Sequence, residues 1–186
     1  MNETLQTILK RRSIRAYKPQ QIKAQDLEAI LEAGQFAPSA MNQQPWHFSA
    51  IQNGDLLNKI NGTVKEALLK ADNPEMANWA KAENFSIFYA APTLIVASGD
   101  PNAIAPQHDC TLALGNMFLA AAALGIGSCW IHAISRICNT EPGKPLLPEM
   151  DVPEGYRIYC AGAFGYHAGV HPEAPPRKEG TVRIIE

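Results

Sequence analysis

The segment Gln107–Leu124 limits how this chain can fold more than any other part of the sequence. It is rich in alanine and leucine and contains one charged residue, Asp109. This composition predicts a helix that is apolar nearly all the way round and must therefore be buried. In a chain of 186 residues, such a helix indicates a dimer interface as readily as a hydrophobic core.

Apolar periodicity divides the rest of the chain into helices and strands, with helices in the majority. Helices are predicted from Asn2 to Leu9, from near Gln25 until Pro38, and over Leu56–Ala71 and Glu75–Tyr89. Strands are predicted over Trp46–Ile51, Thr93–Ser98, Gly125–Ile134, Tyr156–Phe164 and, at one edge, Val182–Ile185. Arg136–Val152 is expected to be a loop with at most a short helix. This order favours one domain, residues 1–186, with an α+β or α/β fold and four or five strands.

Composition argues against several classes of protein. Apolar residues make up 46% and charged residues 18% of the chain, an ordinary globular balance. The formal net charge of -2 argues against nucleic acid as the main partner. No apolar run reaches the roughly 18 residues of a membrane span, and no signal peptide is recognisable. The cysteines show no C-x-x-C spacing, so we expect reduced, buried thiols in a cytoplasmic protein, with no metal site.

The strongest charge pattern lies in the run Arg11–Arg15, three arginines with a serine and an isoleucine. No Asp or Glu occurs from Thr4 to Gln25, although six lysines and arginines do. Unpaired positive charge of this density destabilises a compact state unless an anion meets it. Guanidinium groups and a serine hydroxyl suit phosphate, so the run predicts an anion site. The alternative is a solvated basic turn at a helix end.

Familiar catalytic motifs are missing. There is no G-x-S-x-G, no H-E-x-x-H and no P-loop. Gly125–Gly127 lacks a third glycine and precedes a predicted strand, so it is not a dinucleotide fingerprint. His108 and Cys110 lie two residues apart on a predicted helix and point apart, so we interpret both as structural. An anion site without acid–base residues is typical of an enzyme whose cofactor supplies the chemistry.

Four motifs, in this order, resemble the nitroreductase family of FMN flavoproteins. They are the segments Arg11–Arg15, Ala37–Phe48, Leu124–Ile131 and Pro175–Lys178. The resemblance implies an α+β fold with a mostly antiparallel sheet of four to five strands flanked by helices. It also implies a homodimer that exchanges its C-terminal strands and holds two FMN molecules at the subunit interface, each site built from both chains.

The resemblance assigns cofactor-binding roles to thirteen residues and none to a catalytic side chain or a metal ligand. The flavin-binding start comprises Arg11 at the phosphate, Arg15 at the pyrimidine edge or ribityl chain, and Arg12 and Ser13 between them. The loop that reaches FMN from the other subunit comprises Pro38, Ser39, Ala40 and Asn42. The stretch whose backbone lies near flavin N5 and O4 comprises Ile131, His132 and Ala133. The late basic pair at the phosphate comprises Arg177 and Lys178.

The same resemblance implies an oxidoreductase working in two half-reactions, from NAD(P)H through the flavin to a nitroaromatic, quinone or similar acceptor. The region Pro74–Phe85 would set substrate choice, and Asn61 is a candidate for the family's mid-chain pyrimidine contact. Only the backbone of His132 is expected to matter, since many relatives have Glu-Gly at His132-Ala133. Two alternatives stay open: a flavoenzyme of this fold with other chemistry (dehalogenation, enoate reduction or flavin breakdown), or a flavin-binding protein that is not an enzyme.

Overall fold

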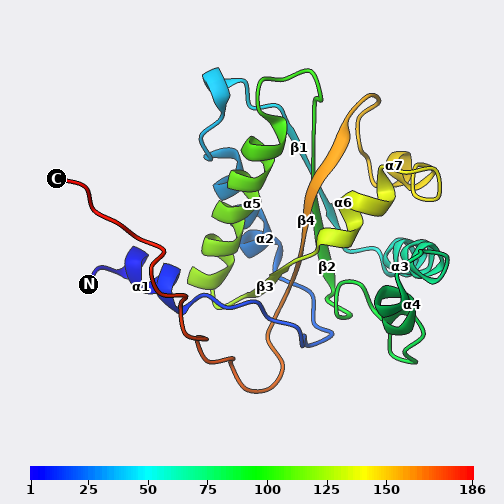
Figure 1. Ribbon diagram of the computed structural model, residues 1–186, viewed down its shortest axis with the longest axis horizontal. Helices are drawn as coiled ribbons and strands as arrows, with labels where there is room; N and C mark the ends of the chain where they lie inside the picture. Colours follow the sequence, from blue (N-terminus) through cyan, green and yellow to red (C-terminus); the bar gives the residue numbers. More distant parts are fainter.

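A computed structural model describes residues 1–186 and has a four-stranded sheet at its centre (Figure 1). The strands are β1 (Trp46–Ile51), β2 (Thr93–Gly99), β3 (Gly127–Trp130) and β4 (Arg157–Gly165). Their order is β1-β2-β4-β3, and every neighbouring pair is antiparallel. The α+β class and the antiparallel sheet are therefore confirmed. Every residue of β2 is buried, as expected for a central strand covered on both faces.

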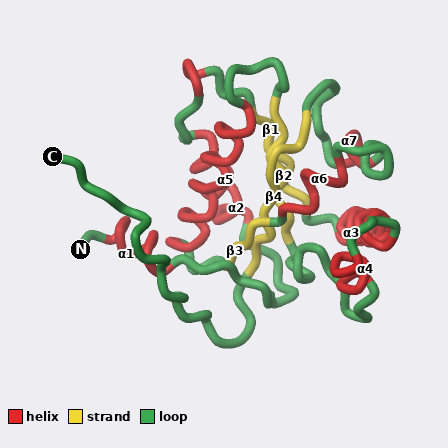
Figure 2. Tube along the Cα trace, in the orientation of Figure 1, coloured by secondary structure: helices red, strands yellow, loops and turns green.

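Helices cover both faces of this sheet (Figure 2). One face carries α2 (Ala24–Gln35) and α5 (Pro106–Ala123); the other carries α3 (Gly54–Leu69), α4 (Pro74–Ala80), α6 (His132–Cys138) and α7 (Leu146–Glu149). The short helix α1 (Glu3–Lys10) stands apart, beside one end of α5. No residue of α1 is buried, although the helix is amphipathic. None of the helices combines the length and apolarity needed to cross a bilayer.

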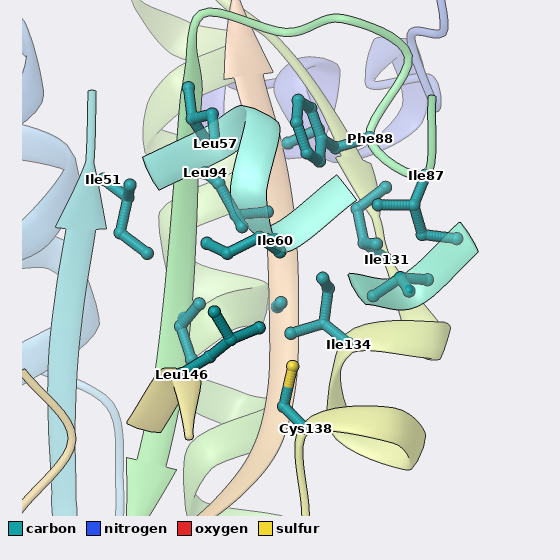
Figure 3. Close-up of a cluster of buried hydrophobic side chains, with 14 of the residues drawn as sticks. Ile51, Leu57, Ile60, Ile87, Phe88, Leu94, Ile131, Ile134, Cys138 and Leu146 are labelled. Carbon is teal, nitrogen blue, oxygen red and sulfur yellow. The ribbon is translucent and has the colours of Figure 1, made fainter. Parts of the chain in front are cut away.

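Two hydrophobic clusters hold these layers together, one on each face of the sheet. Figure 3 shows the larger cluster, in which Ile60 of α3, Leu94 of β2 and Ile134 of α6 meet with no exposed surface. On the opposite face, Leu114 and Phe164 join α5 to β4. Fully burying such a side chain contributes about 1.5–3 kcal/mol, so the sheet and the six helices that cover it form a stable support for anything placed at their ends.

The predicted helix Glu75–Tyr89 is wrong in its second half. Helix α4 ends at Ala80, and the chain continues in turns to Ala91. Asn61 of α3 explains the break: its Nδ2 donates to the Phe85 carbonyl at 3.2 Å, and its Oδ1 accepts the Ile87 N–H at 2.9 Å. Both backbone groups would be needed inside a continuous helix, so a long-range contact overrides the local helical pattern.

Two further predictions, the strands Gly125–Ile134 and Val182–Ile185, are corrected in the second half of the chain. The predicted strand Gly125–Ile134 stops at Trp130, and helix α6 begins at His132, within a run whose apolar residues suit either element. The segment Arg136–Val152 agrees with its prediction as a loop with at most a short helix, since it contains the four-residue helix α7 and only the last residues of α6. Within one chain, Val182–Ile185 forms no strand, and its side chains are exposed.

The two glycines of Gly125-Ile126-Gly127 have separate structural roles, which agrees with their not being a dinucleotide fingerprint. Gly125 has a φ of 72° and ends α5 in a Schellman motif, in which the Ile126 N–H donates to the Ala121 carbonyl at 2.8 Å. Gly127 lies against Ile14, where an added Cβ would come within 2.9 Å of that side chain. A larger residue here would push away the segment that carries the arginine run.

Candidate functional site

The run Arg11–Arg15 is extended and lies along strand β3. Ser13 forms a parallel bridge with this strand, and the Ile14 N–H donates to one of its carbonyls at 2.9 Å. Successive side chains of an extended segment point in opposite directions. Arg11, Ser13 and Arg15 therefore share one face, while Ile14 on the other face is buried in the protein. The backbone of the run is thus fixed, and its alternate side chains have no carboxylate partner.

Arg12 lies off this face and closes helix α1. Its Nη1 donates to the carbonyl oxygens of Leu9 and Arg11, both at 2.7 Å. Carbonyls in the last turn of a helix have no partner within the helix, and a cation there also offsets the helix dipole. The alternative interpretation of the arginine run, a basic residue at a helix end, therefore describes Arg12.

Arg11 and Arg15, in contrast, have no carboxylate partner. The ion pairs of the chain lie elsewhere and are His47–Asp151, Lys59–Glu149 and Lys144–Glu141. Arg11 and Arg12 line a cavity of about 670 Å³ between α1, the C-terminal end of α5 and the start of β3, which Ser13 and Arg15 do not line. Two guanidinium groups without counter-ions, on either side of a serine hydroxyl, form a donor set suited to an anion.

The predicted loop Pro38–Asn42 is held by a carboxylate that sequence reasoning missed. The Ala40 N–H donates to Oδ1 of Asp109, in the first turn of α5, at 3.1 Å. Met41 and Asn42 have φ values of 51° and 54°, a left-handed conformation that is unfavourable for most side chains. Asp109 is buried, and its Oδ2 has no hydrogen-bond partner within the chain. The only sign of this role in the sequence was that Asp109 is the single charged residue of a mostly apolar helix.

Asp109→Ala is expected to release this loop. A hydrogen bond to a charged acceptor contributes about 1.5–3 kcal/mol, so the Ala40 amide should exchange with solvent at least tenfold faster. Hydrogen–deuterium exchange followed by NMR measures this directly. Asp109→Asn, which keeps a carbonyl acceptor, is the matched control and should retain most of the protection. Unchanged exchange in the alanine variant would show that Asp109 does not hold the loop.

The face shared by Arg11, Ser13 and Arg15, called the arginine face below, lies at one end of α5. The loop Pro38–Asn42 of the same chain lies at the other end (Figure 1). The loop is bonded to the first turn of this helix, whereas Arg11 shares a cavity with Ala120 and Ala123 in its last turn. At 1.5 Å per residue, the 18 residues of α5 span roughly 27 Å. One chain therefore does not bring the two predicted groups together around one small molecule.

Ile131, His132 and Ala133 lie where β3 turns into α6. The Ile131 side chain is buried, and its N–H donates to the Ala161 carbonyl of β4 at 2.8 Å. The N–H groups of His132 and Ala133 belong to the first turn of α6, which no side chain caps. Amides in this position have no acceptor within the helix, and the His132 side chain is exposed. These residues can offer backbone donors.

The remaining candidates differ in how they are placed. Arg177 and Lys178 lie in the exposed C-terminal segment, and no side-chain hydrogen bond or ion pair ties them to the rest of the chain. Asn61, weighed as a pyrimidine contact, is instead engaged with the backbone on either side of Ser86. Its amide is therefore already satisfied inside the protein.

The structure agrees with the interpretation of His108 and Cys110 as structural residues. All four cysteines are buried and unpaired. Burial raises the pKa of the Cys110 thiol to about 12, and its Sγ donates to the Ser98 carbonyl at 3.5 Å. His108, two residues earlier in the same helix, is exposed. A neutral, enclosed thiol is not a nucleophile, so Cys110 is unsuited to covalent catalysis.

Comparison with known proteins gives a consistent result. The model of the nitroreductase family matches residues 8–166. A crystal structure of a nitroreductase with bound FMN from Bacteroides fragilis is 41% identical, with a TM-score of 0.94 and full coverage of both chains. A second one, from Desulfitobacterium hafniense, also with bound FMN, is 28% identical, with a TM-score of 0.90 and 99% coverage of both. An Archaeoglobus fulgidus protein with the provisional name NADH dehydrogenase/NAD(P)H nitroreductase is 33% identical, covering 89% of this chain and 86% of its own.

Proposed function

Because this chain belongs to the nitroreductase family, we propose that it is an FMN-dependent oxidoreductase that uses NAD(P)H to reduce nitroaromatic, quinone or similar acceptors. Bound FMN would supply the redox chemistry, taking up hydride at N5 and passing it on in a second half-reaction. The observation that carries the proposal is the shared face of Arg11, Ser13 and Arg15, two cations without counter-ions around a hydroxyl.

This donor set fits FMN. The phosphate of FMN is a dianion that two or three cations can hold, and Arg11 with the Ser13 hydroxyl supplies the first contacts. Arg177 and Lys178, whose side chains have no ion-pair partner in their own chain, would add the rest. Arg15 lies two residues further along the same face, and a cation beside the pyrimidine edge stabilises negative charge there.

We propose that a second copy of the chain completes the site. A twofold arrangement that packs α5 against its counterpart would bring the loop Pro38–Asn42 of one subunit to the arginine face of the other. The uncovered apolar side chains support this packing: Leu5, Ile8 and Leu9 of α1 and Leu112 of α5 are each 46–59% exposed. A monomer gains nothing from exposing them together, and burying them is the usual driving force for a homodimer.

The C-terminal segment is proposed to cross to the partner as an additional strand. Val182, Ile184 and Ile185 are at least 80% exposed, and they belong to an alternating segment typical of a strand. Strand β1 is an open edge of the sheet, whereas the β3 edge is already met by Ser13 and Ile14. An open strand edge and an unpaired strand-forming segment in the same chain favour pairing between two chains.

The backbone of His132 and Ala133 is proposed to face the reactive part of the flavin. Their free N–H groups can donate to acceptor atoms near N5 and O4 without any titrating side chain. Protons can come from water, so no acid or base is required of the protein. Substrate choice is assigned to the region Pro74–Phe85, where Trp79 is 42% exposed and packs edge-on against Phe85.

The visible spectrum of the purified protein tests the proposed function. We expect a yellow homodimer with one FMN per chain, which NADH or NADPH bleaches under anaerobic conditions and a nitroaromatic or quinone restores to yellow. Bleaching followed by reoxidation with oxygen alone would favour other chemistry on the same fold. A protein that is colourless, does not take up added FMN and stays monomeric would contradict the proposal.

A further inference from the structure

Arg15 has a single side-chain partner in the protein, and it is a tyrosine. Its Nε donates to the hydroxyl of Tyr89 at 3.3 Å, and its Cζ lies 5.7 Å from the centre of the Tyr89 ring. The pKa of Arg15 is raised above its ordinary value, mainly because of this hydrogen bond. The guanidinium is therefore a permanent cation whose direction depends on Tyr89, 74 positions further along the chain.

Tyr89 is held in a conformation that its own sequence does not favour. Tyr89 and Ala90 have φ values of 57° and 52°, and a left-handed residue other than glycine costs of order 1–3 kcal/mol. The Tyr89 N–H donates to the Ser86 carbonyl at 3.2 Å, and the Ala90 N–H donates to the Ser86 hydroxyl at 2.7 Å. Asn61 binds the backbone just before these residues. The surrounding bonds thus impose the strained geometry.

No other role in the fold requires the Tyr89 hydroxyl, because its one hydrogen bond is the bond from Arg15. The neighbouring Tyr17 shows the contrast. Its hydroxyl donates to the Ile14 carbonyl at 2.6 Å and lies 3.4 Å from the Ala163 carbonyl, and so joins the arginine run to β4. Backbone strain at Tyr89, whose hydroxyl binds only Arg15, points to a role for Tyr89 in directing the Arg15 guanidinium.

We propose that Tyr89 is a positioning residue for Arg15. This inference rests on the proposed function, in which Arg15 faces the pyrimidine edge of FMN. With Nε bound to Tyr89, the two Nη groups stay free as a planar fork that can meet two acceptor atoms together. Without the hydroxyl, the side chain would sample other rotamers, and the fork would be aligned with its acceptors for only part of the time.

Tyr89→Phe tests the inference, since it removes the hydroxyl and keeps the ring. We expect FMN affinity, measured by titrating the apoprotein, to fall about fivefold, the effect of one hydrogen bond. The midpoint potential of bound FMN should fall as well. The same substitution in an Arg15→Ala background should change neither quantity, because the residue that it positions is absent. Tyr156→Phe, at a half-buried tyrosine whose hydroxyl makes no hydrogen bond, is the matched control and should resemble the wild type.

The outcomes separate the two hypotheses. If the wild-type protein binds no FMN, the proposed function and this inference both fail. If it binds FMN and Tyr89→Phe has the wild-type affinity and potential, the positioning role is wrong although the proposed function stands. An equal effect of Tyr89→Phe in the presence and absence of Arg15 would also overturn the inference, since the tyrosine would then act through something else. The thermal midpoint of the apoprotein identifies any general loss of folding.

Discussion

Leu112→Glu is expected to give a folded monomer that no longer holds FMN. Leu112 is 48% exposed on the outer side of α5, so a charge is tolerated there in a single chain. In the proposed dimer the same position is covered by the partner, and burying an unpaired carboxylate costs far more than the lost apolar contact contributes. Since each proposed FMN site is built from both chains, loss of the dimer should remove cofactor binding altogether.

Size-exclusion chromatography with light scattering and the visible spectrum measure the two effects together. Leu69→Glu is the matched control: Leu69 is 41% exposed near the end of α3, on the opposite side of the sheet, and the substitution is the same. This control should remain a yellow dimer. A Leu112→Glu protein that stays dimeric with one FMN per chain would show that the α5 face is not the interface.

Arg11→Ala is expected to weaken FMN binding about 100-fold while the protein stays dimeric. Hydrogen bonds to a charged partner contribute about 1.5–3 kcal/mol each, and an arginine can make two of them to one phosphate. Titration of the apoprotein with FMN, followed by flavin fluorescence, gives the affinity. Riboflavin, which lacks the phosphate, should bind the variant and the wild type equally, so the loss can be assigned to the phosphate.

Arg12→Ala provides the comparison within the same motif. Arg12 donates to the terminal carbonyls of α1, so its replacement should loosen that helix and affect FMN affinity much less than Arg11→Ala does. An Arg12 variant that loses FMN as strongly as the Arg11 variant would mean that the alternation of side chains along the run does not decide which arginine meets the ligand. Full FMN affinity in Arg11→Ala would remove the phosphate role.

The proposed site depends on strain that the fold supports from a distance. The loop carrying Met41 and the segment carrying Tyr89 both adopt left-handed conformations, and both are held by a buried or half-buried polar side chain, Asp109 in one case and Asn61 in the other. Each of these side chains belongs to a helix packed on the sheet. A change in α3 or α5 can therefore alter cofactor binding without touching the cofactor.

Local sequence was sufficient to predict most of the regular structure and the first half of the proposed site. The first predicted helix begins at Asn2, whose side chain caps α1 by accepting the Leu5 N–H at 3.0 Å, and strand β1 has the predicted bounds. The arginine run could be recognised because unpaired charge is visible in the sequence itself. Nothing local marked Tyr89, since an aromatic residue in an apolar run usually belongs to the core.

What the sequence by itself determined was most of the helices and strands and the cations available for an anion, while its resemblance to a known family implied the antiparallel sheet. The tertiary structure alone decided that no helix reaches Tyr89, because Asn61 takes two backbone groups, at Phe85 and Ile87, that such a helix would have used. It also separated the arginine face from the loop Pro38–Asn42 by the length of α5. The sequence gives the types of residue present and the side on which neighbouring side chains lie. Distances between segments far apart in the sequence depend instead on how the sheet and helices pack.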